Sequence, residues 1–342
     1  MMPARPHLIA DAIPLLDVSA YLAGERGTLE TLAGDLRWAF ENVGFYYLRG
    51  HGIDCSLIDS TYAAAARFHA QPTEKKLALR TDEHNIGYLA MAGGQRAGHR
   101  RSRNDALFLR RERRPDDRDV LANRRFHAMN RWPDDVPGFR DTALAYMRAL
   151  ERLCQRLAPI YAVALDMPAD TFDAAYAEPH IILRMSHYPP LGDDENDDVS
   201  LVPHTDSGFM TLLAPNPVPG LAIQMPDGRW IDAPGIEDAF VVNGGDILHR
   251  WTNERFLSTP HRVINRSTRD RYAIPFFCDP NHDTLIECLP SCCSPANPAK
   301  YPPIQFGEYA VWFARKSYEH LATQPGPDDT AIAPGDRATR RW

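Results

Sequence analysis

The stretch His204-Thr205-Asp206-Ser207-Gly208, followed at once by the apolar run 210–213, indicates more about this 342-residue chain than any other. On an extended backbone, residues two positions apart point to the same side, so the His204 imidazole and the Asp206 carboxylate can reach one ion from one strand end. His261 begins another β-type run and can supply a third ligand. The pattern therefore predicts a metal site built from two strands.

Two histidines and one carboxylate occupy one face of an octahedron and leave three positions open. This is the ligand set of mononuclear non-haem Fe(II) oxygenases, in which the open positions receive a substrate or co-substrate and dioxygen. His-x-Asp by itself is a weak signal, because it occurs often by chance. The surrounding residues therefore decide the interpretation.

The half of the chain after residue 180 contains short β-type runs separated by turn residues such as Pro219-Gly220 and Asp227-Gly228. The runs are 181–188, 210–213, 221–224, 230–232, 240–243, 246–249, 261–265 and 272–278. Many short strands at close spacing are typical of a β-sandwich or barrel. Asn243-Gly244-Gly245-Asp246 is expected to form a tight turn without a chemical role.

Helical periodicity appears outside these runs. Apolar residues recur at helical spacing over 28–43, about 54–70, about 138–165 and about 307–322. Gly44 is expected to end the first helix, and the apolar run 45–48 to form a strand. Pro159 is expected to kink or restart the long helix. The sequence thus predicts a helical N-terminal part, a β core and a helical C-terminal end.

The bulk composition is that of an ordinary globular protein. A formal net charge of −7 and a pI near 6.0 do not favour nucleic-acid binding. No apolar run is long enough to span a membrane and the first residues lack a signal-peptide core, so a cytoplasmic location is expected. The six cysteines are expected to be free thiols. A zinc site at Cys288, Cys292, Cys293 and His282 is the alternative, although Cys-x3-Cys-Cys lacks a usual ligand spacing.

An arginine and a tyrosine accompany the three candidate ligands. Arg271 opens the run Arg-Tyr-Ala-Ile-Pro-Phe-Phe, and Tyr188 ends the run 181–188. A guanidinium fits a carboxylate bidentately, so Arg271 can hold the distal carboxylate of a keto acid whose other end chelates the metal. The Tyr188 hydroxyl can add a hydrogen bond.

With these residues in view, the sequence resembles the isopenicillin N synthase-like branch of the 2-oxoglutarate/Fe(II)-dependent oxygenases. The resemblance covers about residues 11–320 and rests on motifs that are weak singly and specific together. They are Ile13-Pro14-Leu15-Leu16-Asp17, Gly44-Phe45-Tyr46-Tyr47-Leu48 with His51-Gly52-Ile53, Tyr188-Pro189-Pro190, His204-Thr205-Asp206-Ser207-Gly208, Asn243-Gly244-Gly245-Asp246, Ser258-Thr259-Pro260-His261-Arg262-Val263, and Arg271 with Pro275-Phe276-Phe277.

The resemblance implies a mostly β core, a double-stranded β-helix or jelly roll, surrounded by N-terminal and C-terminal helices. It implies Fe(II) bound by His204, Asp206 and His261. It also implies 2-oxoglutarate at Arg271, with Tyr188 as a helper and O2 as the oxidant. The implied activity is hydroxylation, desaturation or cyclisation of a small molecule. No side chain beyond the metal ligands is assigned to catalysis.

Three segments are expected within one compact unit. Residues 1–130 form an N-terminal region of helices and strands, 131–325 the jelly-roll core with its supporting helices, and 326–342 a C-terminal tail. The oligomeric state stays open between monomer and homodimer, and neither nucleic acid nor membrane is an expected partner.

Two positions depart from the family pattern. The family usually carries Arg-x-Ser, in which the serine also contacts the 2-oxoglutarate carboxylate, but here the third residue is Ala273. A hydrogen bond to a charged group is worth about 1.5–3 kcal/mol, so its loss would weaken co-substrate binding by roughly one to two decades unless another donor replaces it. The second departure is Ser186, where plant-like members often carry asparagine.

Eight arginines fall between Arg96 and Arg114. The simpler interpretation is a solvated surface; the alternative is a loop that receives a carboxylate-bearing substrate near the active site. Among the other histidines, His249 is expected in a strand as a core or rim residue. His187 is expected to point away from the side of Tyr188, because neighbours in a strand alternate.

Three alternatives to the 2-oxoglutarate-dependent oxygenase remain open from the sequence. The first is an isopenicillin N synthase-like oxidase that binds its substrate on the metal and uses no keto acid. The second is an ethylene-forming type of activity that consumes 2-oxoglutarate itself. The third is a non-catalytic binding protein, which the complete set of three metal ligands disfavours.

Overall fold

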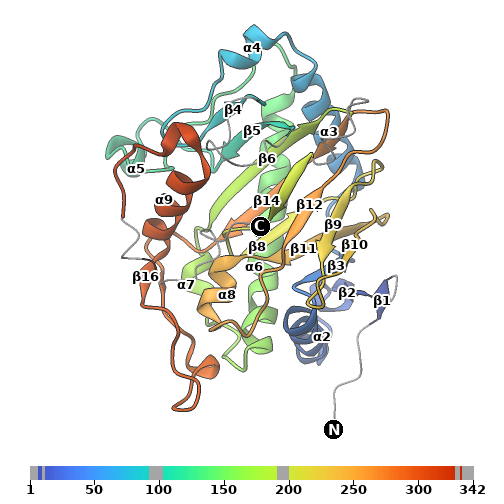
Figure 1. Ribbon diagram of the computed structural model, residues 1–342, viewed down its shortest axis with the longest axis vertical. Coiled ribbons are helices and arrows are strands. Elements are labelled where there is room, and N and C mark those ends of the chain that lie inside the picture. The colour runs from blue at the N-terminus through green and yellow to red at the C-terminus, as the bar shows by residue number, and fades with distance from the viewer. Residues whose placement is uncertain (1–6, 10–11, 92–102, 191–199, 328–331, 333–342) are drawn as a thin grey trace.

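The computed structural model describes residues 7–9, 12–91, 103–190, 200–327 and 332. Its centre is a large twisted β-sheet, and the long helix α6 (Phe139–Ala164) runs behind this sheet (Figure 1). Helices α2 (Thr28–Asn42) and α3 (Cys55–His69) pack against α6. Helix α9 (Phe306–Ser317) covers one edge of the sheet.

The described strands form one large sheet, a second smaller sheet and a short β-pair. The order in the large sheet is β1-β2-β3-β11-β8-β14-β6-β5-β4, with β13 also paired to β6. Its strands are β1 (Leu8–Ile9), β2 (Ile13–Asp17), β3 (Phe45–Arg49), β4 (Gly87–Leu89), β5 (Asp105–Arg110), β6 (His180–Tyr188), β8 (Met210–Leu213), β11 (Ala239–Gly244), β13 (Arg271–Ala273) and β14 (Pro275–Asp279). The smaller sheet has the order β10-β9-β12-β7, with β7 (Leu201–His204), β9 (Leu221–Gln224), β10 (Trp230–Asp232) and β12 (His261–Val263). Strands β15 (Leu285–Ile286) and β16 (Ile304–Gln305) pair separately.

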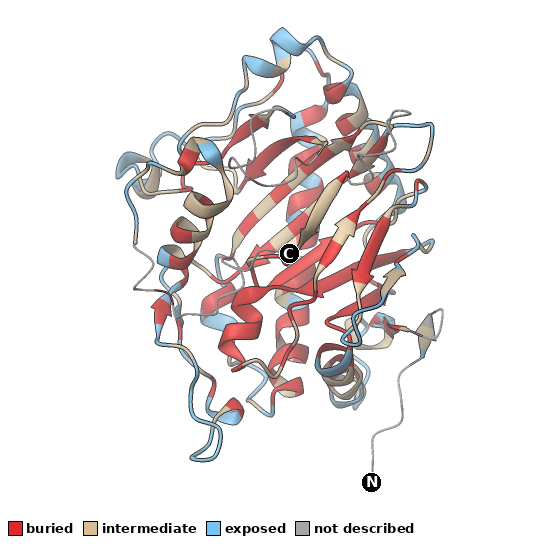
Figure 2. Cartoon of the chain, in the orientation of Figure 1, coloured by how far each residue is buried: buried red, intermediate tan, exposed pale blue. Residues whose placement is uncertain are grey.

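Two facing sheets with flanking helices confirm the predicted mostly β core of jelly-roll type. The N-terminal strands belong to the same sheet as the C-terminal ones, because β3 pairs with β11 and β5 pairs with β6. Buried residues follow the sheets and the inner sides of the helices, whereas the exposed ones gather in loops at the periphery (Figure 2). Among the described residues, no helix combines the length and hydrophobicity needed to cross a bilayer.

The predicted helices are present with small shifts in their ends, and one detail of the long helix is different. Helix α6 runs through Pro159 without restarting. Proline in a helix costs about 3 kcal/mol. The neighbouring residues Leu157, Ala158, Ile160 and Tyr161 are all buried. The free energy gained by packing these residues against the core offsets the cost of the hydrogen bond that Pro159 cannot make.

The prediction of a strand over 246–249 is wrong, because these residues belong to helix α8 (Asp246–Trp251). The backbone N–H of Asp246 donates to the carbonyl of Asp206 at 2.8 Å, and that of Ile247 donates to the carbonyls of Ser207 and Gly208 at 3.2 Å. The first turn of α8 thus holds the loop after β7. This arrangement depends on contacts between distant segments, which local periodicity cannot reveal.

The remaining helical segments are short and lie between the larger elements. They are α1 (Ser19–Leu22), α4 (Thr73–Leu77), α5 (Arg118–Leu121), α7 (Asp173–Tyr176) and the 3-10 turns Pro290–Cys292 and Glu319–Leu321.

Candidate metal and co-substrate site

His204, Asp206 and His261 come together where β7 and β12 meet. His204 is the last residue of β7 and lies directly opposite His261, the first residue of β12. One ligand atom from each of the three lies within 4.8 Å of the others. The Oδ1 atom of Asp206 is 3.9 Å from Nε2 of His204 and 3.7 Å from Nε2 of His261. These distances are longer than a direct hydrogen bond and leave room for an ion between the three atoms.

Backbone carbonyls fix the orientation of both imidazoles. Nδ1 of His204 lies 2.9 Å from the carbonyl of Val202, and Nδ1 of His261 lies 3.2 Å from that of Thr259. A carbonyl only accepts, so each Nδ1 carries the proton and each Nε2 keeps its lone pair. This tautomer is the one that a metal-binding histidine requires.

The Asp206 carboxylate is oriented in the same way. Its Oδ2 atom accepts hydrogen bonds from the Thr211 hydroxyl and the Asn243 side-chain amide, both at 2.7 Å. Oδ1 then remains as the oxygen on the side of the two imidazoles. Asn243 belongs to β11 rather than to a turn. The expectation that the Asn243 motif has no chemical role is therefore too narrow, because Asn243 positions a candidate ligand.

The protonation states also suit a cation. Burial lowers the pKa of His204, and the nearby His261 lowers it further. Burial alone would raise the pKa of Asp206, but the two imidazoles and the hydrogen bonds from Asn243 and Thr211 hold it below its ordinary value. Near neutral pH His204 is therefore a neutral imidazole and Asp206 a carboxylate, the forms that bind a metal.

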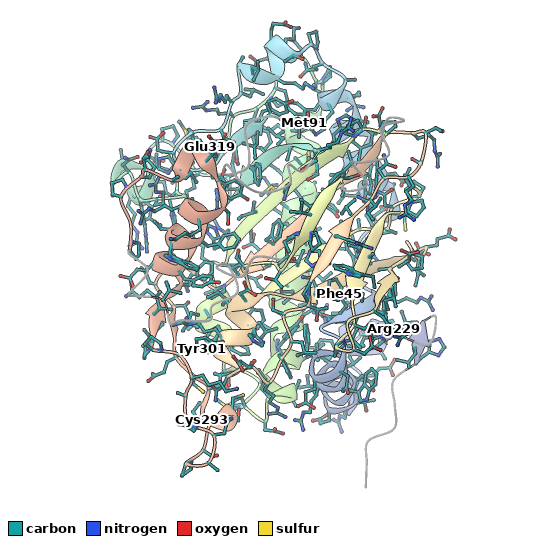
Figure 3. The ribbon with its side chains drawn as sticks, in the orientation of Figure 1. Phe45, Met91, Arg229, Cys293, Tyr301 and Glu319 are labelled. Atoms are coloured by element: carbon teal, nitrogen blue, oxygen red, sulfur yellow. The ribbon has the colours of Figure 1, made fainter. Side chains whose placement is uncertain are left out.

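Asp246 connects the loops that carry the candidate ligands. Its side chain accepts hydrogen bonds from Thr205 at 3.2 Å and from Ser258 at 2.7 Å. Behind His261 lies Phe45, labelled near the middle of the molecule in Figure 3, with its ring edge-on to the imidazole at a centroid distance of 5.5 Å. These contacts tie together the loops that carry the candidate ligands.

Arg271 is a buried cation, and no carboxylate among the described residues forms an ion pair with it. It opens β13 opposite Tyr188 and is 2% exposed. Its Nε donates to the carbonyl of Val218 at 3.1 Å, but one terminal nitrogen has no hydrogen-bond partner among the described residues. Burial lowers the pKa of the guanidinium, which nevertheless stays charged near neutrality. A buried charge of this kind is costly unless a ligand pairs with it.

Tyr188 meets Arg271 through its ring rather than through its hydroxyl. The guanidinium carbon lies 5.4 Å from the ring centroid, within the range of a cation–π contact. Tyr188 is buried, so it also forms part of the wall beside Arg271.

A second unpartnered polar atom lies beside the alanine that departs from the family pattern. Ala273 of β13 is directly opposite Ser186 of β6, and opposed side chains in an antiparallel pair share a face. Ser186 is fully buried, and its hydroxyl has no hydrogen-bond partner among the described residues. The hydroxyl absent at Ala273 is therefore present on the neighbouring strand.

Other candidate residues lie elsewhere. His187 points to the opposite side of β6, as predicted, and pairs with Asp105. His249 lies in α8, where Nδ1 contacts the carbonyl of Phe256. All six cysteines are free, and no described group of three metal-binding side chains includes one. Cys293 lies near the lower end of the molecule in Figure 3, well away from Phe45.

The arginine-rich segment divides into two parts. Arg96, Arg100 and Arg101 lie outside the described residues. Arg111 pairs with Glu151 at 2.7 Å and Arg113 with Asp117 at 2.9 Å. These two arginines have protein partners and do not form an anion-receiving loop.

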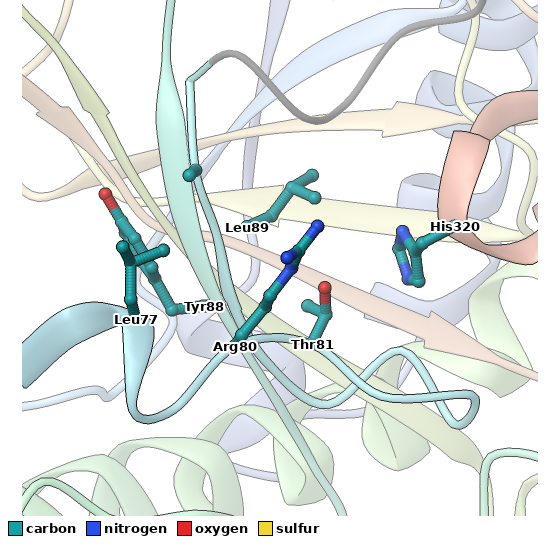
Figure 4. Close-up of a pocket in the computed structure, with 7 residues that line it drawn as sticks. Leu77, Arg80, Thr81, Tyr88, Leu89 and His320 are labelled. Carbon is teal, nitrogen blue, oxygen red and sulfur yellow. The ribbon is translucent and has the colours of Figure 1, made fainter. Parts of the chain in front are cut away.

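A pocket of about 300 Å³ opens beside β4 (Figure 4). Its lining includes Arg80, Thr81, Leu89 and His320, and neither Arg271 nor any of the three candidate metal ligands borders it. Both ring nitrogens of His320 are buried without a hydrogen-bond partner in the described structure. The pocket is therefore a separate feature from the metal site.

Comparison with known proteins identifies the family. The 2OG-Fe(II) oxygenase superfamily matches residues 178–280, and the family described as non-haem dioxygenase in morphine synthesis N-terminal matches residues 13–135. The 2-oxoglutarate-Fe(II) type oxidoreductase hxnY of Emericella nidulans is 34% identical over 316 residues, which cover 90% of each chain. The chain belongs to the 2-oxoglutarate/Fe(II)-dependent oxygenases.

Further relatives support this membership in the isopenicillin N synthase-like branch. The 2-oxoglutarate-dependent dioxygenase citB of Monascus ruber is 33% identical over 81% of this oxygenase and 87% of its own length. The structure of Neurospora crassa T7H with alpha-KG and thymine superposes with a TM-score of 0.78 at 30% identity, covering 92% of this chain and 97% of T7H. JOX2 in complex with 2OG, Fe and JA has a TM-score of 0.76 at 26% identity, with 94% and 90% covered. The protein is thus a 2-oxoglutarate-dependent dioxygenase that uses Fe(II) and O2.

Proposed function

We propose that His204, Asp206 and His261 bind the Fe(II) of this oxygenase and that Arg271 binds the distal carboxylate of 2-oxoglutarate. The observation that carries the proposal is the pair of Nε2 atoms facing Asp206 Oδ1, together with Arg271, which is buried and incompletely partnered on β13. The donor set is the facial triad that suits non-haem Fe(II). Tyr188 packs on the Arg271 guanidinium and limits its contact with water.

The residues of the chain and the bound groups have separate tasks. Bound iron, together with 2-oxoglutarate and O2, supplies the oxidising power that removes hydrogen from a substrate C–H bond. Thr211 and Asn243 orient the carboxylate of Asp206, and two backbone carbonyls orient the imidazoles. No described side chain is needed as a general base. Hydroxylation of a small molecule is the proposed outcome, with desaturation or cyclisation as variants of the same chemistry.

Ser186 takes the place of the serine that the family usually has at position 273. Its hydroxyl lies on the face shared with Ala273 and lacks another partner. A hydroxyl that donates to a carboxylate contributes about 1.5–3 kcal/mol. The Ser186→Ala variant should therefore raise the Kd for 2-oxoglutarate roughly ten- to hundredfold. The double variant Ser186→Ala with Ala273→Ser should recover part of that affinity.

The test of the whole site is an anaerobic titration of the Fe(II)-loaded protein with 2-oxoglutarate, followed by the visible charge-transfer band of the chelate. The wild type should bind one equivalent, and Arg271→Gln should lose about 2–5 kcal/mol of binding free energy because a buried charge pair is broken. Arg271→Lys keeps the charge without the planar fork, so its affinity for 2-oxoglutarate should lie between those of the wild type and Arg271→Gln. A wild-type protein that binds Fe(II) but gives no 2-oxoglutarate complex would overturn the assignment of Arg271.

A further inference from the structure

Arg184 lies on the same face of β6 as the proposed co-substrate residues. It precedes Ser186 by two positions and Tyr188 by four, and alternate residues in a strand point to one side. Directly opposite in β5 stands Phe108. Arg184 is half-buried, and no sequence motif marks it.

The side chain of Arg184 contacts an aromatic ring, and no described carboxylate forms an ion pair with it. Its guanidinium carbon lies 5.4 Å from the centroid of the Phe108 ring. Its Nε is buried without a hydrogen-bond partner in the described structure. The Phe108 ring in turn contacts Tyr318 edge-on at a centroid distance of 5.9 Å. The guanidinium thus lies against one aromatic ring, which itself packs on a second.

Arg184 adds a positive charge to the face of β6 that carries Ser186 and Tyr188. Arg271 is a separate cation on the same face of the sheet, reached through the pairing of β13 with β6. The face therefore presents two guanidinium groups, one more than the distal carboxylate of 2-oxoglutarate needs.

Two arginines at and just after the end of the neighbouring strand β5 show why Arg184 differs. Arg110 at the far end of β5 binds the ring nitrogen of His180 at 2.7 Å and the carbonyl of His84 at 3.1 Å. Arg111 forms its ion pair with Glu151. These side chains are structural because the protein itself satisfies them. A half-buried arginine on the face of the proposed active site, with no carboxylate partner in the described part of the chain, is instead suited to an anionic ligand.

We propose that Arg184 binds the carboxylate of the substrate, and that this oxygenase therefore acts on a small organic carboxylate whose apolar part packs against Phe108 and Tyr318. The proposal rests on the proposed function, because it needs Fe(II) and 2-oxoglutarate to occupy the site between the triad and Arg271. It assigns anion selectivity to one arginine of β6, whereas the expectation for the arginine-rich segment falls partly on residues outside the described structure.

The experiment is a calorimetric titration of the anaerobic protein, loaded with Fe(II) and 2-oxoglutarate, with a panel of aromatic monocarboxylates and their primary amides, including phenylacetate and phenylacetamide. At least one acid should bind tenfold or more tightly than its own amide, since a hydrogen-bonded ion pair is worth about 1.5–3 kcal/mol. Arg184→Gln should remove this preference and leave the 2-oxoglutarate affinity unchanged. Arg184→Lys should retain part of it.

Arg262 provides a matched control. It also has a buried Nε without a partner among the described residues, and its guanidinium stacks on Trp230 at 4.3 Å. It follows His261 in β12 and by alternation faces the other side of the smaller sheet. Arg262→Gln should keep the preference for acids over amides.

Two outcomes would overturn the proposal. One is a panel in which no acid binds better than its amide to the loaded wild type. The other is an acid preference that survives in Arg184→Gln. If the wild type did not form the complex with Fe(II) and 2-oxoglutarate, the proposed function would be contradicted instead. The loading step tests this before any panel compound is added.

Discussion

Among the described residues, two largely buried clusters each combine two histidines with one aspartate, and their hydrogen bonding differs. They are His204, Asp206 and His261 between β7 and β12, and His69, Asp105 and His187 between α3, β5 and β6. In both, one ligand atom from each side chain lies within 4.8 Å of the others. Composition and proximity alone would assign a metal to either cluster.

The hydrogen bonds separate them. In the second cluster, His69 and His187 each use Nδ1 on Asp105, at 3.2 and 2.9 Å. Their Nε2 atoms contact the carbonyl of Met185 and the carboxylate of Asp270. The hydroxyl of Tyr88 also donates to Asp105 at 2.7 Å. Every ring nitrogen is occupied, so this cluster links α3 to the sheet and has no lone pair left for a cation.

In the first cluster, the protein occupies only the atoms that point outward. Both Nδ1 atoms bind backbone carbonyls, while Oδ2 of Asp206 accepts two hydrogen bonds. The inward atoms are left without hydrogen bonds to each other. A metal site therefore needs ligand atoms whose lone pairs are free, in addition to suitable residue types.

The largest expected difference follows from removing the central carboxylate of the first cluster. Asp206→Ala should abolish both stoichiometric Fe(II) binding and turnover, because two imidazoles alone lack the anionic ligand of the triad. Iron content after anaerobic reconstitution and succinate release from 2-oxoglutarate measure the two effects. Iron binding and succinate release at the wild-type level would show that the metal lies elsewhere.

The corresponding change in the second cluster should act on stability. Asp105→Ala leaves His69, His187 and Tyr88 without their shared acceptor, and breaking a buried charged network costs about 3–5 kcal/mol. Urea unfolding of the metal-free protein measures this loss. The folded fraction of Asp105→Ala should still bind one equivalent of Fe(II), and a loss of iron from that fraction would remove the distinction between the clusters.

A smaller effect is expected from the residue that orients Asp206. Asn243→Ala should weaken Fe(II) affinity roughly 10- to 100-fold, as is usual for partners of metal ligands. Competition with a chelator of known affinity gives the value. Asn243→Asp is less suitable because it adds a charge, whereas Thr211→Val removes the other hydrogen bond to Oδ2 and should give a similar loss. An unchanged affinity in both variants would mean that Asp206 needs no such support.

The smallest expected effect is a difference in pH dependence. Burial alone would lower the pKa of His187, but its hydrogen bonds to Asp105 and Asp270 raise it. A raised pKa in the folded state means stabilisation that is complete below about pH 6.5 and is lost as the pH rises through the raised value. The difference in unfolding free energy between wild type and His187→Gln should therefore be larger at about pH 6 than at about pH 9.

The contribution of His204 to stability should have the opposite pH dependence. Its pKa is lowered by burial, so the folded protein resists its protonation while the unfolded chain takes up the proton below about pH 6.5. Stability of the metal-free protein is therefore lost as the pH falls, and His204→Gln should reduce that loss. Equal pH profiles for the His187 and His204 variants would contradict the assigned roles.

Much of the fold followed from local patterns. The helices over 28–43 and 54–70 and the strands around 181–188 and 210–213 were predicted from periodicity, because side-chain alternation and helical spacing are properties of a few residues. Helix α8 was not, since its first turn depends on the carbonyls of the loop 206–208. The roles of Asn243 and Asp246 were missed for the same reason, although their motif was already visible.

The sequence by itself determined the family and the three candidate ligands, because His-x-Asp on an extended segment places two groups on one side whatever surrounds them. It also showed that position 273 lacks the usual hydroxyl. Only the tertiary structure decided which His–Asp–His cluster keeps free lone pairs, that Ser186 lies across from Ala273, and that Arg184 shares their face. These facts arise from strand register and from hydrogen bonds between distant segments, neither of which is encoded in any short stretch of residues.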